Sequence, residues 1–457
     1  SNVVIPNGGI KMIVCDGAGA GAAVTDVLDL TGGTGNVGLG SGSLGTALTT
    51  GTDNVAIGEA SLDAVTTGSD NTVVGDNAGG ALTTGGNNVA IGSGALLVAT
   101  TAADNTAIGT LALTANSSGT DNTAVGYAAG DAVTTGSRNT FVGDNSGGAN
   151  TTADDNTAVG SSALLVNTTG HSNTAVGSLS LDANTTGIRN TAVGFEALSA
   201  NTDGTQNTGV GKGALLVNTT GIENTGVGSS ALDANTTGNY NTAVGQGSLD
   251  ANTTASNNTA IGHDSLKANT TGTQNTGLGK SALAANTTAS QNTAVGYLSS
   301  ATSTTGANNT SVGHGSLYLT TTGSNNTAVG EGSLQSNTTA SNNTAVGQDA
   351  LFANTTGTQN TAVGTSALDH STTASGNVAV GSNALTANTT GPANVAVGKE
   401  ALYTVTTSGS NTAVGNQALY YNTGADNTAV GASALVNNTT GAENTGLGSA
   451  AGQSITT

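Results

Sequence analysis

Hydrophobic and polar positions recur in a fixed 17-residue pattern along almost the whole chain. Each copy opens with a five-residue word that has Asn first, an aliphatic residue fourth and Gly fifth, and 25 copies begin at asparagines from Asn36 to Asn444. Of the 24 intervals between these asparagines, 22 are 17 residues, one is 18 and one is 16. Positions are numbered below from this asparagine. A constant period of this length indicates a solenoid.

Two short apolar words in each copy predict the elements. Position four is Val, Ile or Leu in all 25 copies, position five is always Gly, and position nine is Leu in 20 copies. Gly-rich and Asn-Thr-Thr-Gly words separate them, which is typical of short strands joined by turns, whereas a helix needs a longer stripe at 3.6 spacing. We expect an all-β, parallel β-solenoid (β-roll) of about 25 coils over residues 36–457.

Stacked coils should share one apolar interior, because a single coil cannot bury its own aliphatic residues. We expect asparagines at positions one and twelve to form ladders that hold the turns through their amides. We also expect positions four and nine to form the core ladder, represented by Val176, Leu181, Val193, Leu198, Val210 and Leu215.

Position three carries a row of small residues. If positions two and four point inward, strand alternation turns position three outward, and it is Ala, Gly or Ser in all copies but those with Val73 and Phe141. A smooth outward row would let chains approach closely, so we expect a homo-oligomer. The alternative is that small residues merely fit a tight coil. The predicted chain–chain stripe includes Ala175, Ala192, Gly209, Gly226 and Ala243.

The first 35 residues lack the repeat and read as an N-terminal cap or junction. In residues 1–35 the words "NVVIP" and "KMIVC" flank "NGG", which is a hairpin signal. Only Met12 is a methionine, so the chain looks processed or incomplete at its start. The single Cys15 excludes an intrachain disulfide framework.

Composition and charge exclude several classes of protein. The formal net charge is −20, with 7 basic and 27 acidic residues, so no basic surface is expected for nucleic acid. No apolar run is long enough to cross a membrane. His263 and His314 share a column but lie three coils apart, too far to share a metal. We expect no enzyme, cofactor or metal site.

Carboxylates and aromatics in register are the remaining candidate sites. An acidic column precedes the repeat asparagine; we interpret it as a solvated edge, with cation binding as the alternative, and its members are Asp53, Asp70, Asp104, Asp121, Asp155 and Asp426. Aromatic rings on a polar surface suit the apolar faces of sugars, although rare aromatics also scatter onto tolerant positions. The glycan-contact candidates, all at position ten, are Tyr318, Phe352, Tyr403 and Tyr420.

Two resemblances suggest a biological setting. The word Asn-Thr-Ala-Val-Gly followed by Ala-Leu resembles the head repeats of trimeric autotransporter adhesins over residues 36–457, which implies a homotrimer of β-rolls, although the adhesin repeat is commonly shorter than 17. The segment "VVIPNGGIKMIVCDGAGAGAAVTDVLDL" is similar to one found in tail-fibre proteins of tailed bacteriophages.

Together these resemblances imply the shaft of a phage tail fibre, located in the virion. Its partners would be two further copies of the chain, other tail or baseplate proteins, and a host surface glycan or protein, without membrane insertion. The alternatives are a trimeric bacterial cell-surface adhesin or an extracellular matrix filament. An ice-binding solenoid is less favoured, because adjacent threonines at positions thirteen and fourteen should point opposite ways.

Overall fold

The computed structural model describes residues 12–15, 24–28 and 35–456, the first two segments by their backbone alone. The chain divides into two compact units, Ser1–Glu223 and Asn224–Thr457, and each is described by itself. The regular elements of the described residues are all β-strands, with no helix among them. The described part of the chain is therefore all-β.

One antiparallel pair lies in the N-terminal segment. β1 (Met12–Cys15) pairs with β2 (Val24–Leu28), and Cys15 lies opposite Val24. The hairpin expected across "NGG" has its first strand outside the described residues. Within the described part of the chain, the partner of the "KMIVC" strand is β2.

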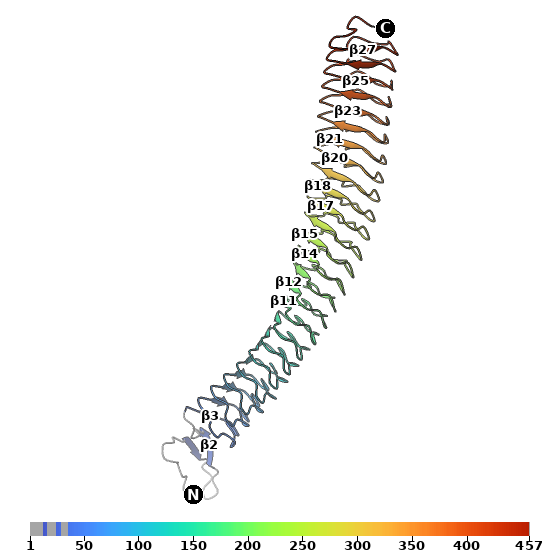
Figure 1. Ribbon diagram of the computed structural model, residues 1–457. Coiled ribbons are helices and arrows are strands. Elements are labelled where there is room, and N and C mark those ends of the chain that lie inside the picture. Colours follow the sequence, from blue (N-terminus) through green and yellow to red (C-terminus); the bar gives the residue numbers. More distant parts are fainter. Residues whose placement is uncertain (1–11, 16–23, 29–34, 457) are drawn as a thin grey trace. The chain divides into compact units, whose positions relative to one another are not determined.

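The first unit contains a row of parallel three-residue strands, each formed by positions two to four of one copy. Neighbouring strands pair in register, so that Thr174, Ala175 and Val176 lie opposite Thr191, Ala192 and Val193. Figure 1 shows these short arrows side by side. The strands are β3 (Val37–Leu39), β4 (Val55–Ile57), β5 (Thr72–Val74), β6 (Val89–Ile91), β7 (Thr106–Ile108), β8 (Thr123–Val125), β9 (Thr140–Val142), β10 (Thr157–Val159), β11 (Thr174–Val176), β12 (Thr191–Val193) and β13 (Thr208–Val210).

The second unit repeats the same arrangement. Its strands also pair in parallel and in register, one per 17-residue turn apart from the shorter step between β25 and β26. Each unit is therefore a parallel β-solenoid. The strands are β14 (Thr225–Val227), β15 (Thr242–Val244), β16 (Thr259–Ile261), β17 (Thr276–Leu278), β18 (Thr293–Val295), β19 (Thr310–Val312), β20 (Thr327–Val329), β21 (Thr344–Val346), β22 (Thr361–Val363), β23 (Val378–Val380), β24 (Val395–Val397), β25 (Thr412–Val414), β26 (Thr428–Val430) and β27 (Thr445–Leu447).

The core of both units is formed by positions three, eight and nine and does not include position four, so half of the predicted core ladder is wrong. Leu181, Leu198 and Leu215 are fully buried, as expected. Val176 and Val210 are only partly buried, and Val193 is 36% exposed. Positions two and four face outward, since alternate residues of a strand point to opposite faces and the middle residue points in.

The small residues at position three therefore do not form an outward stripe. Ala175, Ala192 and Ala243 have no exposed surface, and Gly209 and Gly226 are buried as well. They are small because a core leucine lies directly against them: a Cβ on Gly209 would lie 3.3 Å from Cγ of Leu198 in the preceding turn. Of the two interpretations considered above, the tight coil is the one that the packing supports.

The exceptions at position three confirm this packing. The buried ring of Phe141 lies where leucines stand in other turns, because position nine is Gly130 in the preceding turn and Gly147 in its own. A Cβ would lie 2.6 Å from the ring at Gly130 and 2.3 Å at Gly147. Val73 likewise faces Gly79. Large residues at position three are thus offset by glycine at position nine.

Glycine at position five is required by both conformation and space. Gly177 has a φ of +135°, which residues with a Cβ rarely adopt, and equivalent glycines have similar values. A Cβ on Gly177 would also lie 2.4 Å from the carbonyl oxygen of Gly194 in the next turn. Within each unit, successive turns therefore approach each other through a column of glycines.

The predicted ladder of asparagines at position one is present and buried. Asn71 donates its backbone N–H and its side-chain amide to Oδ1 of Asn54, over 3.1 and 2.9 Å, and the amide also donates to the carbonyl of Gly85 within its own turn, over 3.1 Å. The bond from the backbone N–H recurs in turn after turn, and the bond between side chains recurs in many of them. The ladder satisfies buried polar groups and ties each turn to its neighbour.

A second ladder, at position twelve, has gaps. Asn184 donates its amide to Oδ1 of Asn167 over 2.8 Å and to the carbonyl of Gly187 over 3.0 Å. Where serine follows asparagine, the ladder breaks: Oδ1 of Asn354 and Oγ of Ser371 are both buried without a hydrogen-bond partner. Asn286 and Ser303 show the same defect. An unsatisfied buried polar atom costs about 1–3 kcal/mol.

We therefore expect Ser371→Asn to stabilise the second unit. The new amide would donate to Asn354 Oδ1 and to the carbonyl of Ala374, as Asn252 does to Asn235 and Ala255. A gain of about 1 kcal/mol is expected, measured as a higher urea midpoint. Ser382→Asn, at an exposed serine in the next turn, should leave the midpoint unchanged. A lower midpoint for Ser371→Asn would contradict the ladder account.

Candidate binding surface

The aromatic residues predicted at position ten are only partly exposed, and the structure brings two of the four together. The rings of Tyr403 and Tyr420 stack with centroids 4.9 Å apart and an interplanar angle of 7°. Tyr318 and Phe352 lie two turns apart in the same column, with Gln335 between them. Position ten therefore provides one aromatic pair, on neighbouring turns of the second unit.

A third tyrosine completes this cluster. Tyr421, at position eleven, meets Tyr420 edge to face with centroids 4.6 Å apart, and it is 51% exposed. Reasoning from a single column missed it, although the word "LYY" places it next to Tyr420. Tyr403, Tyr420 and Tyr421 are called the tyrosine cluster below.

Polar side chains at positions six and seven lie beside the tyrosine cluster. Gln417 donates its amide to Oε2 of Glu400 over 2.8 Å, and Lys399 Nζ lies 3.5 Å from Oε1. The hydrogen bond from Gln417, and then Lys399, lower the pKa of Glu400, so it is ionised at neutral pH. Burial, and then the charges of Tyr403 and Glu400, raise the pKa of Tyr420, which stays a neutral phenol.

Position six forms a second exposed column in this unit. Lys280 Nζ lies 6.0 Å from the ring centroid of Tyr297, whose ring stacks on His314 at 5.5 Å. His314 Nδ1 is 3.5 Å from Oε1 of Glu331. The other histidine of this column, His263, pairs instead with Asp264 at 3.0 Å. A search of the described residues finds no group of three or more His, Cys, Asp or Glu that could hold a metal ion.

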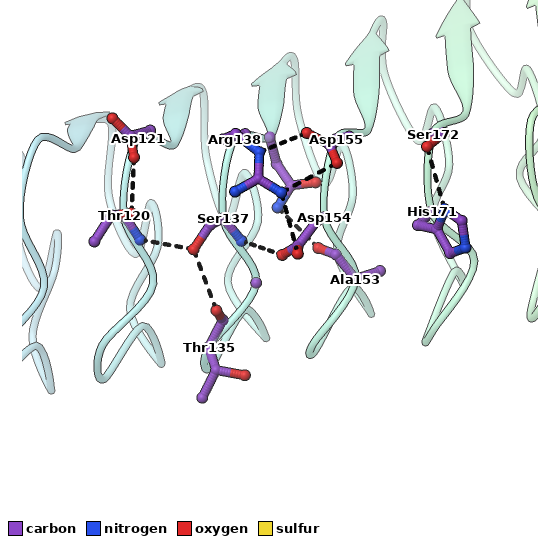
Figure 2. A network of polar contacts seen from close by, with 12 residues as sticks. Thr120, Asp121, Thr135, Ser137, Arg138, Ala153, Asp154, Asp155, His171 and Ser172 are labelled. Atoms are coloured by element: carbon purple, nitrogen blue, oxygen red, sulfur yellow. Dashed lines mark hydrogen bonds and ion pairs between the residues drawn. The ribbon is translucent and has the colours of Figure 1, made fainter.

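The backbone conformation explains why aspartate is common in the acidic column of the first unit. Residues before the repeat asparagine have left-handed backbones, with φ of 58° at Asp53 and 61° at Asp155, and aspartate and asparagine tolerate this conformation better than most residues. Arg138 belongs to the same column, and Figure 2 shows its guanidinium group turned toward Asp154 and Asp155. Its Nε is 2.7 Å from Oδ1 of Asp155, and its Nη2 is 3.3 Å from Oδ2 of Asp154. These groups are solvent-exposed, so the pairs add little stability.

The outward face of the strands carries the same kinds of residue in every turn. Position four supplies an aliphatic residue in all 25 copies, and position two supplies threonine in 20 and valine in the other five. Ile57 and Ile261 are each 38% exposed, and Leu278 is 43% exposed. This row of partly exposed aliphatic side chains is called the outer aliphatic row below.

Comparisons with known proteins supply no relative for these surfaces. No family model matches the chain, and neither a curated protein nor a solved structure matches it significantly. Among the described residues, none forms a helix that could span a membrane.

Proposed function

We propose that the chain is a structural shaft, assembled as a homotrimer through the outer aliphatic row, and that it belongs to a phage tail fibre that extends toward the host cell. The observation that carries this proposal is the row itself. Apolar side chains that stay partly or largely exposed in turn after turn are typical of an interface that another surface covers. The stripe of small residues proposed from sequence is replaced by this row.

The identity of the partner follows from the repeat. A surface that presents one aliphatic residue per turn, at the strand spacing of about 4.8 Å, is matched best by a surface with the same spacing. A second copy of this chain has the same spacing, because it has the same repeat. Closed cyclic symmetry lets each copy bury its row against the others, and the resemblance to adhesin heads supports three copies.

Variation between positions supports the same assignment. Position six is exposed and ranges through Glu59, Tyr127, Lys212 and Gln348, as expected for a position that faces water. Position four is partly exposed yet never polar in 25 copies. A partly exposed position that stays aliphatic is explained by a partner that excludes water from it.

Sedimentation equilibrium of the full chain tests the assembly. The expected mass is three times that of the 43.3-kDa chain. A monomeric mass at every concentration would refute the proposal, and a stable dimer would refute the trimer.

The variant Val346→Asp should weaken the assembly while leaving the fold intact. Val346 lies in the outer aliphatic row and is partly exposed, so an aspartate there stays hydrated in the monomer but loses water in the interface. We expect a shift toward the monomer mass at about tenfold higher protein concentration than in the wild type. The control Gln348→Asp changes position six of the same turn and should leave the trimer unaffected. Equal effects of the two variants would contradict this interface.

The assignment to a phage rather than to a bacterial surface rests on the N-terminal resemblance. An antibody against residues 36–457 should label tail fibres of phage particles in electron micrographs. Labelling of the bacterial surface instead would favour the adhesin or the matrix filament.

The outer face also favours one second candidate, an ice-binding surface. Threonine at position two and an aliphatic residue at position four face outward in parallel rows, a pattern different from the adjacent threonines considered in the sequence. This function needs the face uncovered, so it applies to a monomer. Measurable thermal hysteresis by a monomeric chain would support it, and unchanged ice growth would exclude it.

A further inference from the structure

The tyrosine cluster differs from the rest of the surface in that three rings and a fixed pair of polar groups lie together. Tyr421 is 51% exposed although the ring of Tyr420 meets it edge to face, with centroids 4.6 Å apart. Tyr420 is held between the stacked ring of Tyr403 and the edge contact with Tyr421. The contact with Tyr420 therefore restricts the rotamers of the exposed Tyr421 side chain.

Glu400 lies near the ring of Tyr420, and a hydrogen bond joins Gln417 to Glu400. Position seven neighbours position ten of the following turn: a Cβ on Gly332 would lie 3.4 Å from Cδ2 of Phe352. Glu400 has the same relation to Tyr420, and Gln417 is hydrogen-bonded to Glu400 over 2.8 Å. A carboxylate that accepts and an amide that both donates and accepts thus border the aromatic surface.

We propose that the tyrosine cluster, with Glu400 and Gln417, is a binding site for a neutral carbohydrate. The apolar face of a pyranose ring would stack on Tyr421, and its hydroxyls would hydrogen-bond to the Glu400–Gln417 pair. Stacking suits the aromatic face, and the paired polar groups suit neighbouring hydroxyls. An acidic polysaccharide fits poorly, because the chain carries a net charge of −20. This proposal specifies a class of ligand for the attachment of the fibre to its host. It depends on the proposed function only for that biological role, and not for the binding itself.

Affinity electrophoresis of the full chain tests the site. The probes are native gels that contain a neutral β-glucan, a neutral galactomannan or acidic polygalacturonate. We expect retardation of the wild type in at least one neutral gel, an affinity about three- to tenfold lower for Tyr421→Ala, and little change for Tyr421→Phe. The control Tyr240→Ala removes a tyrosine of equal exposure, 50%, outside the cluster and should behave as the wild type.

Three outcomes would overturn the inference: no retardation in either neutral gel, retardation by polygalacturonate alone, or equal losses in Tyr421→Ala and Tyr240→Ala. Sedimentation of the same samples separates this test from that of the proposed function. A trimer that does not bind sugar contradicts only the carbohydrate site, whereas a monomer that binds it contradicts only the shaft.

Discussion

Gly177→Ala is expected to destabilise the first unit by at least about 3 kcal/mol, since it combines a strained backbone with a collision. The φ of +135° at Gly177 is one that alanine rarely adopts. Its Cβ would also lie 2.4 Å from the carbonyl oxygen of Gly194, which is backbone and cannot rotate away. The turns on either side would have to separate, weakening the strand pairing that joins them.

Gly213→Ala is the matched control in the same unit. Gly213 also has a positive φ, +62°, but a Cβ there meets nothing within 4 Å. Alanine occurs at the equivalent position in other turns, at Ala60 and Ala128, so a cost of about 1 kcal/mol is expected. Urea unfolding followed by circular dichroism measures both, and amide exchange locates the loss, because repeat proteins open by neighbouring turns. Similar costs for the two substitutions would show that contact between turns is not the cause.

The solenoid could be predicted from sequence because its causes are local and repeated. The period, the short strands and the asparagine ladders all follow from residues that recur at one spacing, such as Asn54 and Asn71. Buried Leu181 and Leu198 were identified for the same reason.

Alternation alone could not show which residues of each strand point into the core. Alternation requires only that Thr174 and Val176 point one way and Ala175 the other, and the assumption that the larger aliphatic residue must be inside is wrong for this fold. Leucine at position nine already fills the interior, which leaves room only for a small residue opposite it. The sequence does contain a signal for the correct direction, namely that unusual residues at position three occur together with unusual residues at position nine. Val73 occurs with Gly79, and Ser311 occurs with Ser300, whose hydroxyl oxygen lies 2.9 Å from that of Ser311. Only core partners compensate in this way.

The surface was predicted less completely, because contact between side chains depends on more than their column. Tyr403 and Tyr420 were expected to be neighbours and do stack. Tyr421 belongs to another column, and its contact with Tyr420 arises from the local path of the turn. The Glu400–Gln417 pair joins two turns at position seven, where the sequence shows no regularity. Such contacts became visible only in the structure.

Phe141→Ala is the second large effect, and its repair tests the size rule of the core. Removing the fully buried ring leaves a cavity between Gly130 and Gly147, for an expected loss of about 3–5 kcal/mol. Phe195→Ala, which removes a ring that is 45% exposed in the same unit, should cost less than about 0.5 kcal/mol. Urea midpoints of the two variants give the comparison.

Adding Gly130→Leu and Gly147→Leu to Phe141→Ala should recover most of the lost stability. The triple variant recreates the turns in which alanine faces leucine, and the glycines have φ of +59° and +62°, close to the +53° of Leu198. Gly147→Leu alone should destabilise by at least about 1–3 kcal/mol, because its Cβ would already lie 2.3 Å from the ring of Phe141. If a leucine destabilises the wild type but stabilises the Phe141→Ala variant, its effect must come from the space that the phenylalanine ring occupies. A triple variant no more stable than Phe141→Ala would mean that residues at positions three and nine are not exchangeable in volume, and that the ring stabilises these turns in some other way.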